Sequence, residues 1–435
     1  MNREPLIMVC TCEIAGRVRG KSFPAADRAQ RLTTGVGWVP TNTMISCFGH
    51  IGDTPFGATG DLILVPDGKT EVKVDFGPDS APEHFYLGDI RETDGRPWAC
   101  CPREFLRRAL ADLKAVAGLQ LNSAFEQEFV YGGIEDMPGA PYSLDAYRRQ
   151  GIFGEALIAA LRQAGVMPDS FLPEYGARQF EVTCDPALGI ASADHAVITR
   201  EMARAVAQRL GNRAIFSPIL DPRGVGNGVH IHMSFQDEAG RPVMHDPAGA
   251  YGLSSVARQF MAGVLRHLPA ICAVTAPSTV SYFRLTPNRW APTHAYIAER
   301  DREASLRVCP LLTLPGSDAA RQFNVEFRAA DAAASPYLAL GALVHAGVSG
   351  IRGKLTLPEP RDIPRLGKAE REAVGIRHLP HSLGEALDNL EATPEARDWF
   401  GPVFLDAYLR HKRAEIKMLD GLDESQQCAR YTLVY

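Results

Sequence analysis

The stretch NGVHIHMSF, residues 227–235, constrains the fold more than any other part of the chain. It places two histidines one residue apart in an otherwise apolar run. Because side chains alternate between the two faces of a β-strand, His230, His232 and Ser234 share one face and only apolar side chains occupy the other. The pattern predicts a strand that packs on a core with one face and borders a polar space with the other.

Further segments repeat this arrangement of an apolar back and an ionisable front. Their polar faces carry Glu126 and Glu128 in NSAFEQEFVY, Glu181 in RQFEVTC, and Asn324, Glu326 and Arg328 in QFNVEFRAAD. Another glutamate, Glu174, lies shortly before Glu181. A lone pair of glutamates or histidines on a strand is most often a solvated or structural face. Several such strands in one chain indicate a shared polar site.

Glutamates gathered in one site repel one another, and burial disfavours their charged forms further. Divalent cations would neutralise them. Carboxylate oxygens with an imidazole suit Mg²⁺ or Mn²⁺ better than a closed structural zinc site. Metal ions beside guanidinium groups indicate phosphoryl chemistry, and the chain offers arginines for it. These are Arg284, Arg289, Arg300, Arg302 and Arg307.

The glycine-rich run DPRGVGNGVH, residues 221–230, matches neither common phosphate-binding loop. It lacks the Gly-Lys-Ser/Thr of a P-loop, and it precedes a predicted strand, whereas a Rossmann fingerprint opens a helix. Its glycines make a tight turn or contact a ligand, and the sequence leaves both open.

Charge and composition exclude several classes of partner. The chain has 435 residues and a net charge of −5, and it contains no dense Lys/Arg run, which argues against nucleic acid or an anionic membrane. No apolar stretch is long enough for a membrane span or a signal peptide. The nine cysteines are scattered without a C-x-x-C pair. We therefore expect a cytoplasmic protein with reduced thiols.

The pattern along the chain divides near residue 100. Residues 1–98 are rich in short β-prone runs separated by Gly and Pro, and Pro102 is typical of a helix start. Helical periodicity follows at 142–165 and 194–211, and Ser335-Pro336 predicts an N-cap and first helical residue. The tail from about 367 to 427 is predicted to be mostly helical.

A set of short motifs, weak singly and specific in their order, resembles the glutamine synthetase family over most of the chain. They are RVRGKSFP, DLILVPDG, CPREFLRRAL, FEQEF, PEYGARQFEV, GNGVHIHMSF, FRLTPNRWAP, ERDREASLRV and NVEFRAADAAASPYLALGALVHAG. The resemblance implies an α+β fold. An N-terminal β-grasp domain, residues 1–100, would precede a catalytic domain, residues 101–435, with a curved antiparallel sheet and flanking helices. It also implies a homo-oligomer, a dodecamer of two stacked hexameric rings, with sites at subunit junctions.

The resemblance also assigns roles to individual residues. The metal ligands would be Glu126, Glu128, Glu174, Glu181, His230 and Glu326, holding about two or three Mg²⁺ or Mn²⁺ ions. ATP, the co-substrate, and its phosphates would meet His232, Ser234, Arg302, Arg307 and Arg321. Substrate glutamate would meet Gly226, Arg284 and Arg328. Of these, Arg302 and Arg328 would act on the reacting groups as catalytic residues.

Departures from the family pattern gather at the amine end. Trp290 stands where ammonia-using members carry a glutamate, Val225 replaces an asparagine, and Leu172 replaces a histidine. Asp53 is only a candidate for the aspartate that the family brings to the amine. An indole suits the carbon part of an organic amine better than ammonium. We expect an ATP-dependent ligase of nitrogen metabolism or amine catabolism that forms a γ-glutamyl amide through an acyl phosphate.

Other functions compete with this one. Ordinary glutamine synthesis from ammonia would need other groups to handle ammonium. A catalytically inactive ring serving as scaffold or sensor conflicts with the complete ligand set. Phosphoryl transfer to a different acceptor, as in guanidino kinases, conflicts with the arginines at the glutamate end. The small-molecule substrates expected are ATP, glutamate and an amine.

Overall fold

The N-terminal part folds around a mixed sheet. The computed structural model describes residues 3–137, 139–287, 289–312, 314–359, 363 and 366–435. The first sheet contains β1 (Leu6–Cys12), β2 (Val18–Pro24), β3 (Val36–Trp38), β4 (Leu62–Pro66), β5 (Val72–Val74) and β6 (Glu83–Glu92). The order is β2-β1-β6-β4-β3, with β5 beside β6 and with β1 parallel to β6. Helix α1 (Arg28–Thr34) packs on β4.

A second, larger sheet carries the polar-faced strands predicted above. It contains β7 (Gln120–Tyr131), β8 (Pro168–Pro173), β9 (Gln179–Cys184), β10 (Ala187–Leu188), β11 (Ala214–Ile215), β12 (Val229–Gln236), β13 (Ile297–Glu299), β14 (Leu306–Val308) and β15 (Val325–Ala330). Its order is β13-β14-β15-β12-β7-β9-β8, and β10 and β11 both pair with β7. The expected α+β fold is confirmed, but the sheet is not purely antiparallel, because β13 and β14 run parallel at one edge.

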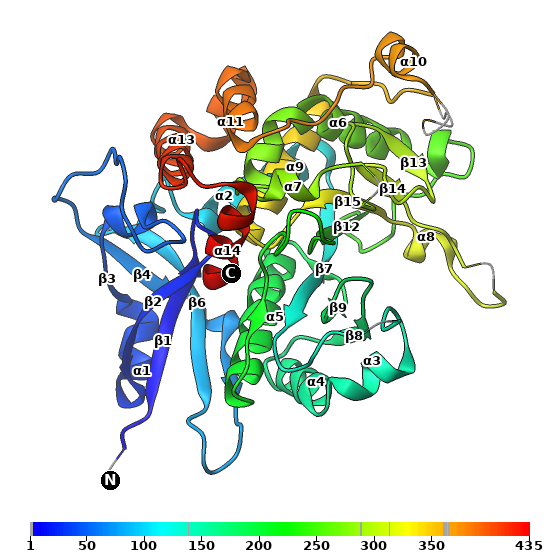
Figure 1. Ribbon diagram of the computed structural model, residues 1–435. Coiled ribbons are helices and arrows are strands. Elements are labelled where there is room, and N and C mark those ends of the chain that lie inside the picture. Colours follow the sequence, from blue (N-terminus) through cyan, green and yellow to red (C-terminus); the bar gives the residue numbers. More distant parts are fainter. Residues whose placement is uncertain (1–2, 138, 288, 313, 360–362, 364–365) are drawn as a thin grey trace.

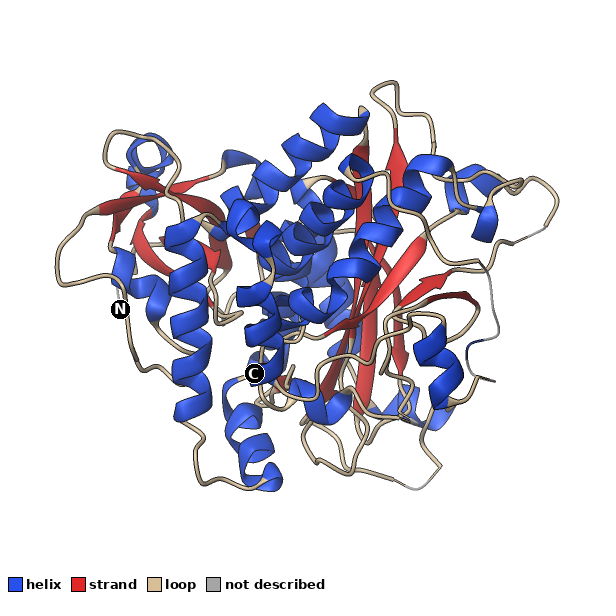
Figure 2. Cartoon of the chain, turned by 90° about the horizontal axis from the view of Figure 1, so that it is seen from above, coloured by secondary structure: helices blue, strands red, loops and turns tan. Residues whose placement is uncertain are grey.

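Helices lie between the two sheets, as Figure 2 shows from above. The helices that follow the first sheet along the chain, in the part that the structure describes, are α2 (Pro102–Ala117), α3 (Leu144–Arg149), α4 (Phe153–Gln163), α5 (Ile190–Arg209), α6 (Ser255–Thr275), α7 (Ser281–Arg284), α8 (Ala319–Gln322), α9 (Pro336–Arg352), α10 (Lys368–Ala373), α11 (Leu383–Ala392), α12 (Pro394–Phe400), α13 (Pro402–Lys417) and α14 (Glu424–Val434). Helices α2 and α5 contact β7, and α6 contacts β15. The apolar backs of β7 and β12 are buried, as alternation predicts.

The predicted helix boundaries hold only in part. Pro102 begins α2 as expected. The 142–165 segment breaks at Gly151, whose φ of 62° ends one helix before the next begins. Ser335 precedes α9 as predicted, but its hydroxyl donates to the carbonyl of Cys12 instead of capping the helix, tying the catalytic part to β1. In the part of the chain that the structure describes, no helix combines the length and apolar character of a membrane span.

Candidate active site

The polar faces of the large sheet border a cavity of about 650 Å³. All six predicted metal ligands line it, namely Glu126, Glu128, Glu174, Glu181, His230 and Glu326. The predicted phosphate and glutamate contacts Gly226, Arg284, Arg302, Arg307 and Arg328 line it as well, together with His232 and Trp290. Residues from β7 to β15, more than a hundred positions apart, thus meet in one space.

Strand register explains why these side chains meet. His230 on β12 lies opposite Glu126 on β7, and Glu128 on β7 lies opposite Glu181 on β9. On the other side of β12, Glu326 of β15 lies opposite His232. Each pair is a direct cross-strand neighbour, which is the closest approach that a sheet gives to side chains on one face. The two glutamates placed opposite each other repel, so this register is unfavourable without positive charge.

Two histidines hold Glu126. His230 Nδ1 lies 2.9 Å from Glu126 Oε2, and His232 Nε2 lies 2.9 Å from Oε1 of the same carboxylate. Burial alone would raise the pKa of Glu126, but hydrogen bonds from both imidazoles lower it well below its usual value. Because Nδ1 of His230 is engaged by a carboxylate, its Nε2 is left to face the cavity, the arrangement typical of metal-binding histidines.

Glu181 shows that the site lacks positive charge. Burial and the nearby carboxylates of Glu126, Glu128 and Glu174 raise the pKa of Glu181 to about 9. Burial and Glu128 also raise the pKa of Glu174. Glu126, Glu181 and His230 each offer a donor atom within 4.8 Å of the others. The donor set and its unbalanced charge therefore fit divalent cations.

The Glu326 side of the cavity is compensated by arginines. Glu326 Oε1 accepts hydrogen bonds from Arg307 at 3.1 Å and, at short range, from Arg328. Burial would raise the pKa of Glu326, but His230, Arg328 and His232 lower it to about 2. Arg328 also donates to the carbonyl of Arg302 at 2.9 Å, which fixes the loop that presents the exposed Arg302 side chain.

Two predicted nucleotide contacts lie in an adjoining cavity of about 380 Å³. Ser234 and Arg321 line it, and Glu126, Glu181 and His232 border both cavities. Gly226 lies beside the glutamate-binding candidates, where a Cβ would meet Arg284 Cγ at 2.4 Å and the Pro218 carbonyl at 2.7 Å. The glycine is therefore required for the buried Arg284 to approach.

The predicted amine end is built mainly from aromatic and apolar side chains. Trp290 is half exposed and meets Tyr175 edge-on, with ring centroids 4.9 Å apart. Leu172 and Val225 line the same cavity. The Tyr142 hydroxyl donates to Glu174 Oε2 at 2.8 Å. Of the residues that the structure describes, the acidic ones lining this cavity are the five glutamates of the predicted metal set.

Asp53 is not brought to this cavity within one chain. It pairs with Arg410 at 3.1 Å and lines a different hollow beside α13. The described residues that line the candidate site all belong to the segment 126–328, so the N-terminal sheet contributes none of them. Within one chain, the candidate Asp53 therefore does not reach the amine end, because its loop extends from the N-terminal sheet.

The sequence patterns did not assign Cys309, Tyr142 or Tyr175 to the candidate site. Cys309 lies in the cavity with Sγ 3.6 Å from Glu326 Oε2. Alternation could have found it, since it follows Arg307 by two positions on an extended segment. Tyr142 has a φ of 54° and follows an irregular loop, and no periodic signal places such a residue.

Comparison with known proteins decides the family. The family description "Glutamine synthetase, catalytic domain" matches residues 99–431, and "Glutamine synthetase N-terminal domain" matches residues 2–98. The chain belongs to the glutamine synthetase family. It is an ATP-dependent ligase, and glutamine synthetase family enzymes use ATP and divalent metals.

Individual glutamine synthetase relatives differ in their named activities. A "Gamma-glutamylpolyamine synthetase GlnA3" of Streptomyces coelicolor is 33% identical over 99% of this chain and 93% of its own length. A "Glutamine synthetase" of Methanocaldococcus jannaschii is 29% identical over 82% of this chain and 79% of its own. A solved structure described as a novel glutamine synthase homolog is 40% identical, covers 100% of this chain and 99% of its own, and has a TM-score of 0.93. Another, described as "Apo GmaS without ligand", is 26% identical, covers 98% and 96%, and has a TM-score of 0.82.

Proposed function

We propose that this ligase joins the γ-carboxylate of glutamate to an organic amine and cleaves ATP in doing so. The observation that carries the proposal is the amine end of the cavity, where Trp290 and Tyr175 form an aromatic wall. Ammonium is small and strongly hydrated, and a site for it needs a carboxylate that replaces water and takes a proton. An amine with a carbon chain instead gains binding free energy by burying that chain against the indole.

The reaction needs a leaving group, because a carboxylate is a poor electrophile. ATP transfers its γ-phosphoryl group to the γ-carboxylate and leaves as ADP. The unprotonated amine then attacks the acyl carbonyl, phosphate leaves, and the amine proton passes to the departing phosphate. Arg302 and Arg307, which line the cavity, would hold phosphate oxygens, and Arg284 and Arg328 would hold glutamate. Mg²⁺ or Mn²⁺ held by the glutamates and His230 would neutralise the phosphoryl oxygens. His232 and Ser234, with Arg321, would face the nucleotide from the adjoining cavity.

Ordinary glutamine synthesis is the second candidate, favoured by relatives that carry that name. An inactive scaffold is disfavoured because every predicted metal ligand lines one cavity. The test is ATP-dependent phosphate release with glutamate and a panel of alkyl, aryl and hydroxyalkyl amines, polyamines and ammonium. We expect release with an organic amine, dependent on Mg²⁺ or Mn²⁺ and absent in excess chelator. Full activity in chelator would contradict the metal assignment.

We also propose a ring-shaped oligomer, a dodecamer in the family arrangement. The separation of Asp53 from the cavity of its own chain supports sites completed by a neighbouring subunit. Light scattering on the active protein tests this assembly, and an active monomer would refute it. Asp53→Asn should then lower activity when all subunits carry it, although the substitution lies outside the single-chain cavity.

A further inference from the structure

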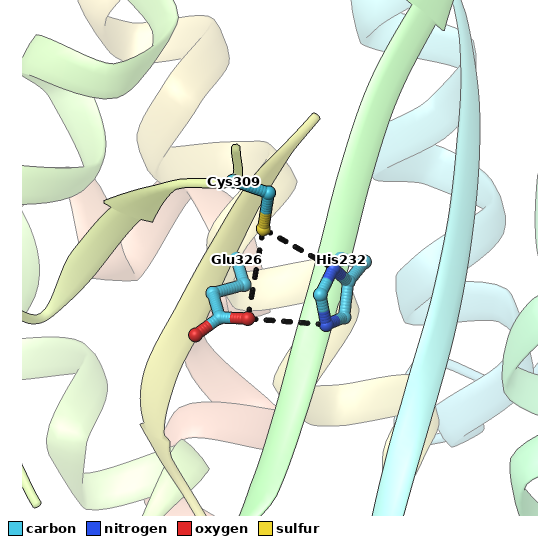
Figure 3. A group of neighbouring side chains, drawn as sticks. All are labelled: His232, Cys309 and Glu326. Carbon is cyan, nitrogen blue, oxygen red and sulfur yellow. Dashed lines mark hydrogen bonds and ion pairs between the residues drawn. The ribbon is translucent and has the colours of Figure 1, made fainter. Parts of the chain in front are cut away.

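Figure 3 shows a thiol that the proposed reaction does not use. Cys309, just after β14, points toward His232 of β12 and Glu326 of β15. Its Sγ lies 3.6 Å from Glu326 Oε2 and 3.7 Å from His232 Nδ1, and Glu326 Oε2 lies 3.3 Å from His232 Nε2. Each of the three residues offers a donor atom within 4.8 Å of the others.

The hydrogen bonds around His232 determine which nitrogen faces the cluster. Asn324 Nδ2 donates to the Gln322 carbonyl at 3.0 Å, which turns Asn324 Oδ1 toward His232 Nδ1 at 2.8 Å. Because that oxygen only accepts, Nδ1 carries a hydrogen. Nε2 then faces two carboxylates, Glu126 Oε1 at 2.9 Å and Glu326 Oε2 at 3.3 Å. Only a cation at this point, either a proton or a metal ion, makes that arrangement favourable.

The spacing matches a coordination sphere. Bonds of about 2.0–2.2 Å to nitrogen and oxygen and about 2.3 Å to sulfur put neighbouring donors roughly 3.0–3.6 Å apart. Glu326 Oε2 meets both His232 Nε2 and Cys309 Sγ within that range, at 3.3 and 3.6 Å. The third pair does not yet match, because Cys309 Sγ lies beside His232 Nδ1 at 3.7 Å, so the half-buried Cys309 side chain must rotate to reach a metal bound at Nε2. We propose that Cys309, His232 and Glu326 form a site for a thiophilic divalent cation of the Zn²⁺ class.

This site differs in chemistry from the proposed magnesium set. Mg²⁺ prefers oxygen donors and avoids thiolate, whereas Zn²⁺ accepts sulfur, imidazole and carboxylate together. On binding, the thiol proton and any proton on Nε2 leave to solvent, and the metal takes their place. Because Glu326 would belong to both sets, Zn²⁺ here and full magnesium occupancy exclude each other. Zn²⁺ therefore acts as an inhibitor that competes with Mg²⁺.

The experiment uses Co²⁺, which absorbs in the near ultraviolet when it binds thiolate. Chelator-treated full-length protein is titrated with Co²⁺ and then with Zn²⁺, and binding is read from the spectrum, so the outcome does not depend on the amine. We expect a thiolate–Co²⁺ band that Zn²⁺ removes. Cys309→Ser should abolish the band and weaken Zn²⁺ binding by at least roughly 10–100-fold.

The matched control is Cys184→Ser, because Cys184 is a buried thiol that lines the adjoining cavity. Its band and Zn²⁺ affinity should equal those of the native protein. Circular dichroism shows whether each variant is folded. The second variant, Cys309→Ala, shows whether the loss of binding is specific to one substitution. The absence of a thiolate band in native protein, or an unchanged band and Zn²⁺ affinity in folded Cys309→Ser, would overturn the inference.

Discussion

The two ends of the candidate cavity are built in different ways. The carboxylate and histidine end rests on regular strands, with Glu126 of β7 opposite His230 of β12 and Glu128 of β7 opposite Glu181 of β9. The aromatic end rests on loops, where Tyr142 and Trp290 adopt positive φ values of 54° and 52°. Left-handed backbone is unfavourable for a bulky residue and persists only where surrounding contacts hold it.

This difference suggests a division of roles, in which the sheet end would fix the reaction and the loop end would select the substrate. A hydrogen-bonded sheet holds charged groups at fixed cross-strand distances, as binding ATP and metal ions requires. Loops can change sequence without changing the sheet, so we expect the partner that attacks the proposed acyl phosphate to be selected there. The following substitutions test each end.

The largest effect is expected at the sheet end. Glu128→Ala and Glu326→Ala should each lower activity by more than about 100-fold, because each removes a proposed metal ligand. They should differ in stability. Glu326→Ala leaves Arg307 and Arg328 buried without their carboxylate, at a cost of about 3–5 kcal/mol. Glu128→Ala relieves repulsion with Glu181 and should destabilise the fold less. Urea unfolding measures the loss of stability in each variant, and equal losses would contradict the expected difference.

A pH-dependent effect is expected from Glu181. Its pKa is raised from 4.5 to about 9 in the folded chain, so without divalent cations the folded state binds this proton more tightly than the unfolded state. The free energy of unfolding therefore falls as pH rises through that interval. The gain in Tm on adding Mg²⁺ should be larger near pH 8.5 than near pH 6. Glu181→Gln should reduce this difference, and a gain independent of pH in the native protein would argue against the charge imbalance.

The loop end should show an intermediate effect. Burying two or three methylenes against Trp290 contributes about 2 kcal/mol, or on the order of 30-fold in affinity. Trp290→Ala should therefore lower kcat/KM for an organic amine by about that factor and change ammonium use much less. Trp290→Glu should move the preference toward ammonium. If Trp290→Ala lowers kcat/KM equally for the organic amine and for ammonium, the indole stabilises the loop and does not contact the amine.

The smallest effect is expected at Tyr142. Its hydroxyl donates to the carboxylate of Glu174, but the residue is 55% exposed, so solvent replaces much of the hydrogen bond. Tyr142→Phe should lower kcat/KM by no more than about tenfold. The matched control is Tyr147→Phe, because Tyr147 on α3 is also exposed, and this substitution should leave kcat/KM unchanged. A loss larger than about tenfold for Tyr142→Phe would mean that the Tyr142 hydroxyl fixes the position of Glu174, although Tyr142 is largely exposed.

The contrast between the two ends also explains what could be predicted from sequence. Alternation placed Glu126, Glu128 and His230 on one face, because a strand repeats every two residues and tolerates no slip without reversing its faces. The same rule applied one step further along the β14 segment would have included Cys309. It could not place Tyr142 or Tyr175, because loop geometry depends on contacts between distant segments.

Helix boundaries and the position of Asp53 show a further limit. Periodicity found α2 and α5 but did not single out α6, and the break at Gly151 depends on a single left-handed residue within a helical pattern. The motifs left Asp53 only as a candidate for the amine end, and its own chain holds it against Arg410. A contact between subunits, as proposed above for Asp53, would leave no periodic trace in one sequence.

The central claim is that the aromatic end of the cavity selects an organic amine over ammonium. A direct competition tests it: the native enzyme, ATP, Mg²⁺ and glutamate are incubated with ammonium and one amine at equal free-base concentrations, and both amide products are measured by mass spectrometry. We predict that at least one alkyl, aryl or hydroxyalkyl amine is consumed with a higher kcat/KM than ammonium. If ammonium is preferred over the whole panel, Trp290 does not select the amine, and ordinary glutamine synthesis is the better account.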